Sequence, residues 1–312
     1  AATVIQTAGA TATVNQDGDN NVGPFGGREN NVATVFQTAD AAEATINQNG
    51  NLNLSAIDQL ADATAITTQT GTYNTSSITQ SGSTAGAVAT VTQGGGYGDN
   101  VSNVNQTTRA FATVDQKGQP SVGPAFTNTS NITQSGLDSS AGVTQNGANN
   151  LSTVAQSAAN SSAIVKQNGS FLTSSVIQEG GAGSLASVTQ TGSDQFSAVL
   201  QTGAGSSAVV EQSGSSNDSS VILSGSSNFA EVQQQGSRNN SLVSQTGNNN
   251  ATNIGDIGVL QTGDDHFSDV SQTGNSGLVR VVQSNTYGSG GFGGNSAKID
   301  QSADGVISAS QR

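Results

Sequence analysis

Short runs of alternating apolar and polar residues, each closed by a glutamine, repeat along the whole chain. Each run reads small residue, any residue, Val or Ile, any residue, Gln, as in residues 12–16 (ATVNQ) and 152–156 (STVAQ). There are 26 such runs, most often 11 residues apart, and Leu223 replaces Gln once. Because side chains alternate between the two faces of a strand, the small residue, the β-branched residue and the Gln share one face. β-Branched residues also favour strands over helices. The pattern therefore predicts a series of short β-strands.

The character of the small residue reveals a longer period. We number positions backwards from each Gln, so that the β-branched residue is at −2 and the small residue at −4. From the fifth run to the twenty-first, position −4 alternates strictly between Ser and Ala, from Ser55 and Ala65 to Ala230 and Ser241. The true period is thus two runs, about 22 residues, which marks a repeat architecture. Gly usually stands two residues after the Gln, where it suits a tight turn. We predict an all-β fold, a two-sheet β-solenoid of about 13 strand-turn-strand coils with amyloid-like stacking, formed by residues 1–312 as a single domain.

Residues about 22 apart should stack roughly 4.7–4.8 Å apart in such a solenoid. A buried Gln or Asn amide can then donate to the amide of one neighbouring coil and accept from the other. Odd-numbered runs usually carry Asn at position −6, whereas even-numbered runs carry Ala, Ser or Gly there. The candidate core-ladder residues are Gln16, Gln37, Gln48, Gln145, Gln156, Gln167, Gln190, Gln201, Gln212, Asn53, Asn74, Asn128, Asn150, Asn217 and Asn239.

Charge supports this assignment of faces. The chain has 21 acidic and 8 basic residues, and none of them falls at position −4, −2 or 0. A buried unpaired charge is costly, so these three positions are expected to face inward. The net charge of −13 argues against nucleic acid and anionic membranes as partners. No run of 18 apolar residues occurs, so no membrane insertion is expected. The absence of Cys is compatible with any compartment. The start of the chain inside a strand pattern without Met fits either a mature secreted form or a sequence cut at an arbitrary boundary.

Five insertions interrupt the repeat, near residues 17–30, 94–99, 117–127, 247–256 and 284–294. Four of the five follow even-numbered runs, so these four are expected to leave the same side of the coils. Tolerance of extra residues on that side would explain them. Alternatively, their aromatic residues make lateral contacts with neighbouring molecules or a surface. The candidate edge-loop contacts are Phe25, Tyr97, Phe126, Tyr287 and Phe292.

Catalytic chemistry finds little support, and we expect no enzyme activity, no cofactor and no metal site. The single His, His266, occupies position −6 where sister runs carry Asn, so it is interpreted as a ladder substitute. No Cys is present to act as a nucleophile or zinc ligand. Residues 17–20 (DGDN) share the start of a calcium loop but lack its twelve-residue ligand pattern, and a turn is the better interpretation.

The runs resemble the curlin repeat, in which S-x5-Q is followed by a turn and then N-x5-Q. Ser139 to Gln145 and Asn150 to Gln156 fit the two halves, and residues 188–192 (VTQTG) fit the short form V-x-Q-x-G. Curlins are subunits of curli, the extracellular amyloid fibres of bacterial biofilms. The resemblance implies a bacterial protein that is secreted through an outer-membrane pore, meets a nucleator and polymerises at the cell surface. The chain has more coils than a typical curlin.

The predicted function is accordingly that of a structural subunit of a curli-like functional amyloid fibre, which polymerises head to tail and serves biofilm matrix, surface adhesion and cell aggregation. Each subunit would add about 60 Å of fibre. The end coils would join by adding strands to open sheet edges, through Val4, Gln6, Ile307 and Gln311. One alternative is a monomeric or fibre-tip adhesin that binds a surface or a polysaccharide. A less favoured one is an ice-binding solenoid, because the outer Thr series is interrupted by residues such as Ile164 and Glu231.

Overall fold

The structure is a computed structural model that describes residues 1–7, 9–18, 30–82, 85–95, 99–118, 127–251, 258–285, 294–302 and 304–311. The described residues contain 26 β-strands and no helix. The chain divides into two compact units, Ala1–Ala155 and Gln156–Arg312, which are described one at a time. Strand β13 (Leu151–Gln156) contains the boundary between them.

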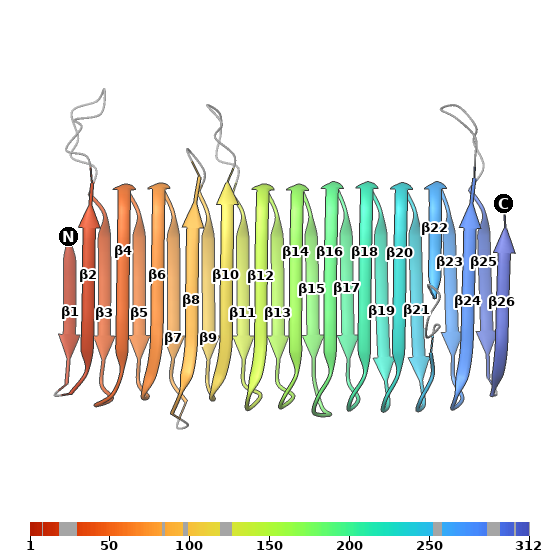
Figure 1. Ribbon diagram of the computed structural model, residues 1–312, viewed down its shortest axis with the longest axis horizontal. Helices are drawn as coiled ribbons and strands as arrows, with labels where there is room; N and C mark the ends of the chain where they lie inside the picture. The colour runs from red at the N-terminus through yellow and green to blue at the C-terminus, as the bar shows by residue number, and fades with distance from the viewer. Residues whose placement is uncertain are drawn as a thin grey trace. The chain divides into compact units, whose positions relative to one another are not determined.

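In the first unit, odd-numbered strands pair with one another in one sheet and even-numbered strands in a second sheet (Figure 1). The odd strands are β1 (Ala2–Gln6), β3 (Val32–Gln37), β5 (Leu54–Gln59), β7 (Thr75–Gln80), β9 (Val101–Gln106) and β11 (Thr129–Gln134). The even strands are β2 (Thr11–Asp17), β4 (Glu43–Asn51), β6 (Ala63–Thr72), β8 (Ala87–Gly94), β10 (Ala110–Gly118) and β12 (Ser139–Ala148).

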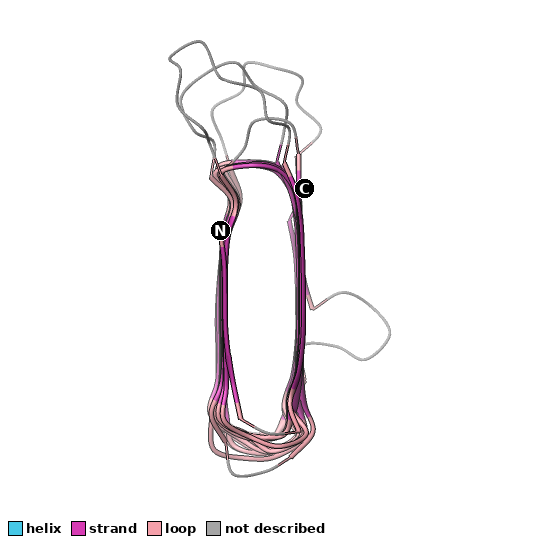
Figure 2. Ribbon diagram, turned by 90° about the vertical axis from the view of Figure 1, so that its left-hand side faces the viewer, coloured by secondary structure: helices cyan, strands magenta, loops and turns pink. Residues whose placement is uncertain are grey.

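The second unit repeats this arrangement. Its odd strands are β15 (Thr173–Gln178), β17 (Phe196–Gln201), β19 (Asp218–Ser224), β21 (Asn240–Thr246), β23 (Phe267–Gln272) and β25 (Ser296–Gln301). Its even strands are β14 (Ser162–Ser170), β16 (Leu185–Ser193), β18 (Ser207–Ser215), β20 (Phe229–Ser237), β22 (Val259–Asp264), β24 (Gly277–Ser284) and β26 (Gly305–Gln311). In each unit the two sheets face one another and are joined by turns at both ends of the strands (Figure 2).

Neighbouring strands in each sheet run parallel, and their pairing brings equal positions of the repeat together. Gln59 of β5 pairs with Gln80 of β7 in the first unit, and Gln190 of β16 pairs with Gln212 of β18 in the second. A slip of one residue would turn every inward side chain to solvent, so the buried pattern fixes this register. The predicted all-β, two-sheet solenoid is confirmed.

Burial follows the predicted two-residue period. In β16, Ala186, Val188 and Gln190 are all 0% exposed, and they occupy positions −4, −2 and 0. Among the described residues, no Asp, Glu, Lys or Arg belongs to the buried set. Each strand therefore contributes one small residue, one β-branched residue and one amide side chain to the core.

The glycine after the Gln differs in part from the prediction of a tight turn. On even strands this glycine still belongs to the strand, as for Gly192 within β16. The chain turns two residues later, at a non-glycine residue with positive φ, such as Tyr73 (φ 63°) or Asp194 (φ 54°). Even strands such as β16, with 9 residues, are thus longer than odd strands such as β17, with 6.

The insertion expected near 247–256 also enters the fold at a different place. Gly247 and Asn249 keep the regular turn contacts, donating backbone N–H groups to Ser224 and Ser226. Ala251 pairs with Phe229, and β22 then begins at Val259, which pairs with Val232. The pairing of the even sheet is therefore interrupted between Ala251, at position −5, and Val259, at position −2, whereas the turn at Gly247 and Asn249 stays regular.

Candidate functional site: the amide columns and the sheet edges

Within each unit, the inward Gln side chains form columns in which the Gln–Gln hydrogen bonds run in one direction. Gln37 Nε2 donates to Gln59 Oε1 over 2.8 Å, and Gln59 Nε2 donates in turn to Gln80 Oε1 over 2.9 Å. The same direction, from one coil to the following coil of the chain, recurs along both units with bond lengths from 2.7 to 3.1 Å. We call these the Gln columns, one for each sheet.

The opposite sheet sets this direction. Gln178 Nε2 donates to Gln201 Oε1 over 2.8 Å and also lies 3.1 Å from the carbonyl oxygens of Ser162 and Ser184. Those carbonyls lie across the core, so the amide nitrogen has to face them and its oxygen faces the preceding coil. Gln156 Nε2 supplies the bond to that oxygen over 2.8 Å. The Gln columns therefore bind the two sheets to each other as well as coil to coil.

The Asn residues at position −6 of odd strands build a third column, which we call the Asn column. Asn217 Oδ1 accepts the backbone N–H of Asn239 over 3.1 Å, while Asn217 Nδ2 donates to the Gly236 carbonyl over 3.0 Å. In the first unit, Asn53 Oδ1 accepts the backbone N–H of Asn74 over 3.1 Å. Asn53 and Asn217 thus fix the turn and the strand start of the following coil. Asn100 differs, because its Nδ2 donates to Asn74 Oδ1 of the preceding coil over 2.9 Å.

The sequence-predicted ladder residues are placed as follows. All of them are buried except Gln16, which is partly exposed and donates to Gln48 Oε1 over 2.8 Å. His266, at position −6 of β23, is 1% exposed and lies in the Asn column.

A column of Ser hydroxyls at position −4 of odd strands was predicted as a repeat feature, but its chemistry was not foreseen. Nine of these hydroxyls are buried without a hydrogen-bond partner: Ser55, Ser102, Ser130, Ser152, Ser174, Ser197, Ser219, Ser241 and Ser268. Ser76 differs, because Thr67 stands in the Val position of the facing strand and its Oγ1 lies 3.3 Å from Ser76 Oγ. Position −4 of an odd strand therefore faces position −2 of an even strand.

Leu223 interrupts one Gln column. It pairs with Gln201 on one side and Gln245 on the other, and it is 0% exposed. Gln245 Oε1 is buried and has no hydrogen-bond partner, as expected when the preceding coil offers no donor. The substitution is visible in the sequence, but the resulting orphan oxygen follows only from the one-way direction of the column.

The glycines near the ends of the even strands stack so closely that no side chain fits. A Cβ added to Gly192, which has φ 124°, would lie 1.9 Å from the carbonyl oxygen of Gly214. By contrast, a Cβ added to Gly142, on the outer face of β12, would have no heavy atom within 4 Å. The strand-end glycines are therefore required by packing as well as by backbone conformation.

At the first sheet edges, the Gln columns end on acceptors. Gln6 Nε2 donates to Gln37 Oε1 over 2.7 Å, and among the described residues no donor reaches Gln6 Oε1. Val4, in the same strand, is 44% exposed. β1 and β2 are the first strands of their sheets in this chain.

At the last sheet edges, the columns end on donors. Gln311 Oε1 accepts from Gln283 over 3.1 Å, and Gln311 Nε2 donates to the Ser296 carbonyl over 2.9 Å. Among the described residues, the second N–H of Gln311 has no acceptor. Ile307, in the same strand β26, is partly exposed. The two ends of the columns are therefore complementary in hydrogen-bonding character.

The predicted edge-loop contacts, Phe25, Tyr97, Phe126, Tyr287 and Phe292, lie outside the described residues. The outer Thr series considered for ice binding is present in the first unit, where Thr13 pairs with Thr45, but Ile66 interrupts it in the next coil. Among the described residues, no group of three or more His, Cys, Asp or Glu side chains could hold a metal ion. Within the same residues, no helix with the length and apolarity of a membrane span is found.

These columns and edges define a class: a parallel β-solenoid of stacked repeats whose interior is cross-linked by side-chain amides. The family model of the curlin associated repeat matches residues 136–169, 181–214 and 225–255. The curlin repeats predicted from the sequence are thus confirmed in this part of the chain. No curated protein matches the chain significantly.

Proposed function

We propose that the chain is a structural subunit of an extracellular, curli-like functional amyloid fibre that polymerises head to tail. The observation that carries the proposal is the opposite character of the column ends, with oxygen acceptors at β1 and β2 and amide donors at β25 and β26. The matches to the curlin associated repeat support the same conclusion. The proposed roles are in biofilm matrix, surface adhesion and cell aggregation. The proposed location is the cell surface, reached by secretion through an outer-membrane pore and with a nucleator as a candidate partner. We propose no catalytic activity.

In this proposal, the last strands of one copy pair in parallel with the first strands of the next. Gln301 and Gln311 would donate to Gln6 and Gln16 of the next copy and continue both Gln columns. Backbone groups at an open sheet edge are a ready template for a further strand. The net charge of −13 would keep single copies apart until these edges meet.

The backbone register shows which residues present their N–H groups to each open edge. Thr7 N donates to Gln37 O and Ala33 N to Ala1 O, so alternate residues of β1 bond to β3. Val4 lies between those residues, and its N–H therefore points to the open edge. By the same alternation Val14 faces the open edge of β2, whereas Asp300 and Ser310 face the open edges of β25 and β26.

The test uses proline at these positions, because proline removes an edge N–H and leaves the bonds to the neighbouring strand intact. One variant combines Val4→Pro with Val14→Pro, and the other combines Asp300→Pro with Ser310→Pro. Matched controls carry Thr at all four positions and keep the N–H groups. Electron microscopy and fibre diffraction should show cross-β fibres for the unchanged chain and the controls, and none for either proline variant.

Mixing the two proline variants separates head-to-tail growth from other modes. Each variant retains one competent end, so an equimolar mixture should stop at dimers in analytical ultracentrifugation. Fibres from either variant alone, or from the mixture, would overturn the proposal. So would an unchanged chain that remains monodisperse at high concentration.

A further inference from the structure

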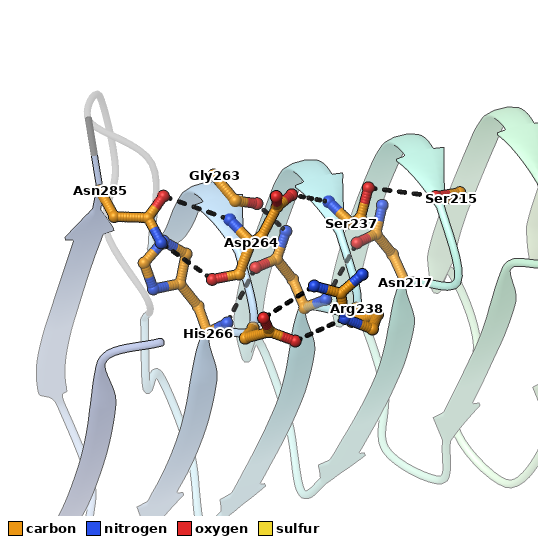
Figure 3. A network of polar contacts seen from close by, with 10 residues as sticks. Ser215, Asn217, Ser237, Arg238, Gly263, Asp264, His266 and Asn285 are labelled. Atoms are coloured by element: carbon orange, nitrogen blue, oxygen red, sulfur yellow. Dashed lines mark hydrogen bonds and ion pairs between the residues drawn. The ribbon is translucent and has the colours of Figure 1, made fainter. Parts of the chain in front are cut away.

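His266 replaces an amide in the Asn column and brings an imidazole into the core of the second unit. It is the only histidine of the chain and is 1% exposed. Figure 3 shows it between Asn217 and Arg238 on one side and Asn285 on the other. Imidazole is the side chain whose ordinary charge change falls between about pH 5 and 8. A buried imidazole in a column of uncharged amides therefore gives that column a group that can respond to protons.

The ring reproduces the contacts of an asparagine amide. His266 Nδ1 accepts the backbone N–H of Asn295 over 3.1 Å, as Asn217 Oδ1 accepts that of Asn239 over 3.1 Å. His266 Nε2 lies 3.0 Å from the Thr262 carbonyl, the counterpart of the Asn217 contact with the residue four places before it. Because a carbonyl only accepts, Nε2 must carry the proton and Nδ1 must be free of one. The site thus requires the neutral Nε2–H tautomer.

A second proton on the ring would destroy the contact with the following coil. A protonated Nδ1 would direct an N–H group at the N–H group of Asn295, and neither can accept. Asn295 leads directly into β25, and its carbonyl accepts both the Phe267 N–H and Gln283 Nε2 over 2.8 Å. Displacement of Asn295 therefore loosens the start of β25 and one contact to the even sheet.

The charged groups around the ring come from three segments. Asp264 lies in β22 two residues after Thr262, whose carbonyl contacts the ring. The Asp264 carboxylate accepts the Ser237 N–H over 2.8 Å. Asp265 directly precedes His266 and forms two bonds, of 2.6 and 2.8 Å, with Arg238 in the preceding coil. The hydrogen bond from that guanidinium holds the pKa of Asp265 below its ordinary value. Both carboxylates are thus already engaged by other donors when the ring gains its proton.

We propose that His266 is a proton-sensitive joint of the Asn column. When neutral, it takes the place of asparagine and fixes the start of β25. When protonated, it releases Asn295 and loosens β25. The contacts of His266 lie within one chain and form whether or not the chain polymerises. Acid would therefore open the last coil before the rest of the second unit.

Amide hydrogen exchange of the full chain tests the joint. The Asn239 N–H, bonded to an asparagine oxygen in the same column, serves as an internal reference, so the ratio of Asn295 to Asn239 protection cancels the intrinsic pH dependence of exchange. The ratio should fall about tenfold between pH 7.5 and pH 5.0. In His266→Asn, which restores the residue of the sister coils, it should stay constant. A constant ratio in the unchanged chain, or an equal fall in His266→Asn, would overturn the proposal.

Nitrogen NMR of the imidazole gives an independent measurement. At pH 7.5 the ring should show a protonated Nε2 and an unprotonated Nδ1. The opposite tautomer at that pH would contradict the hydrogen bond with Asn295 and refute the proposal, whatever the exchange data show.

Discussion

Restoring glutamine at the interrupted position of its column should stabilise the second unit. In Leu223→Gln, the new Nε2 can donate to Gln245 Oε1, and the new oxygen can accept from Gln201. The bond that relieves the buried orphan oxygen contributes about 1–3 kcal/mol, and the further hydrogen bond from Gln201 contributes about 0.5–1.5 kcal/mol. The lost burial of leucine costs about 1.5–3 kcal/mol, part of which the methylenes of glutamine retain. We expect a net gain of about 1 kcal/mol.

The reverse change is the matched control. Gln178→Leu leaves Gln201 Oε1 without its donor and removes the acceptor of Gln156, so it should cost about 2–4 kcal/mol. Hydrogen exchange of peptides covering β19 to β21 measures Leu223→Gln, and peptides covering β15 to β17 measure Gln178→Leu. The guanidinium midpoint is compared for both variants. If the free energy of opening rises by about 1 kcal/mol, amide exchange that requires opening becomes about fivefold slower. If Leu223→Gln exchanges as fast as the unchanged chain and Gln178→Leu is also silent, the columns do not stabilise the fold as argued.

Three further predictions concern the turns, the Ser column and the outer face. Gly192→Ala should cost about 2–4 kcal/mol, because its Cβ would overlap a backbone carbonyl, whereas Gly142→Ala should be neutral or stabilising by about 0.5–1 kcal/mol; equal guanidinium midpoints would contradict the close stacking. Val210 faces the Ser column as Thr67 does, so Val210→Thr should be nearly neutral. Val221 faces the Ala column, so Val221→Thr should cost about 1–3 kcal/mol in the same assay. The opposite order would refute the assignment of facing positions. Burial raises the pKa of Glu231, so the folded chain holds this proton more tightly than the unfolded chain and loses stability as pH rises through that pKa. Glu231→Gln should therefore raise the guanidinium midpoint at pH 7 and leave it unchanged at pH 3, and a rise at both values would point to another cause.

The sequence was sufficient for the strands and for their inward faces, because a two-residue period and a 22-residue repeat leave few other arrangements. It placed Val188 and Gln190 inside, and the structure buries both. The interruption of an even strand after Ala251 could not be predicted, because an insertion breaks the spacing without revealing which position it displaces. The use of Tyr73 and similar residues in a left-handed turn was also missed, since glycine is the usual signal for that conformation.

The sequence predicts which residues form the Gln columns, but it does not predict the direction of their hydrogen bonds. Spacing alone indicates that Gln37 stacks on Gln59, but either amide could donate. Which amide donates depends on carbonyl groups of the facing strand, such as those that Gln178 contacts. Their positions depend on the stagger of the two sheets, which the repeat sequence does not specify. The unsatisfied oxygen of Gln245 follows from that choice.

The common direction of the Gln columns also has an electrical consequence. A side-chain amide carries a dipole of the same kind as a peptide group, and head-to-tail alignment makes such dipoles add, as they do along a helix. Backbone dipoles in a sheet largely cancel, so the glutamines should dominate the field along each column. The first ends, at Gln6 and Gln16, would carry partial negative charge, and the last ends, at Gln301 and Gln311, would carry partial positive charge. Such a field would orient approaching copies before they touch, and added salt would weaken that guidance.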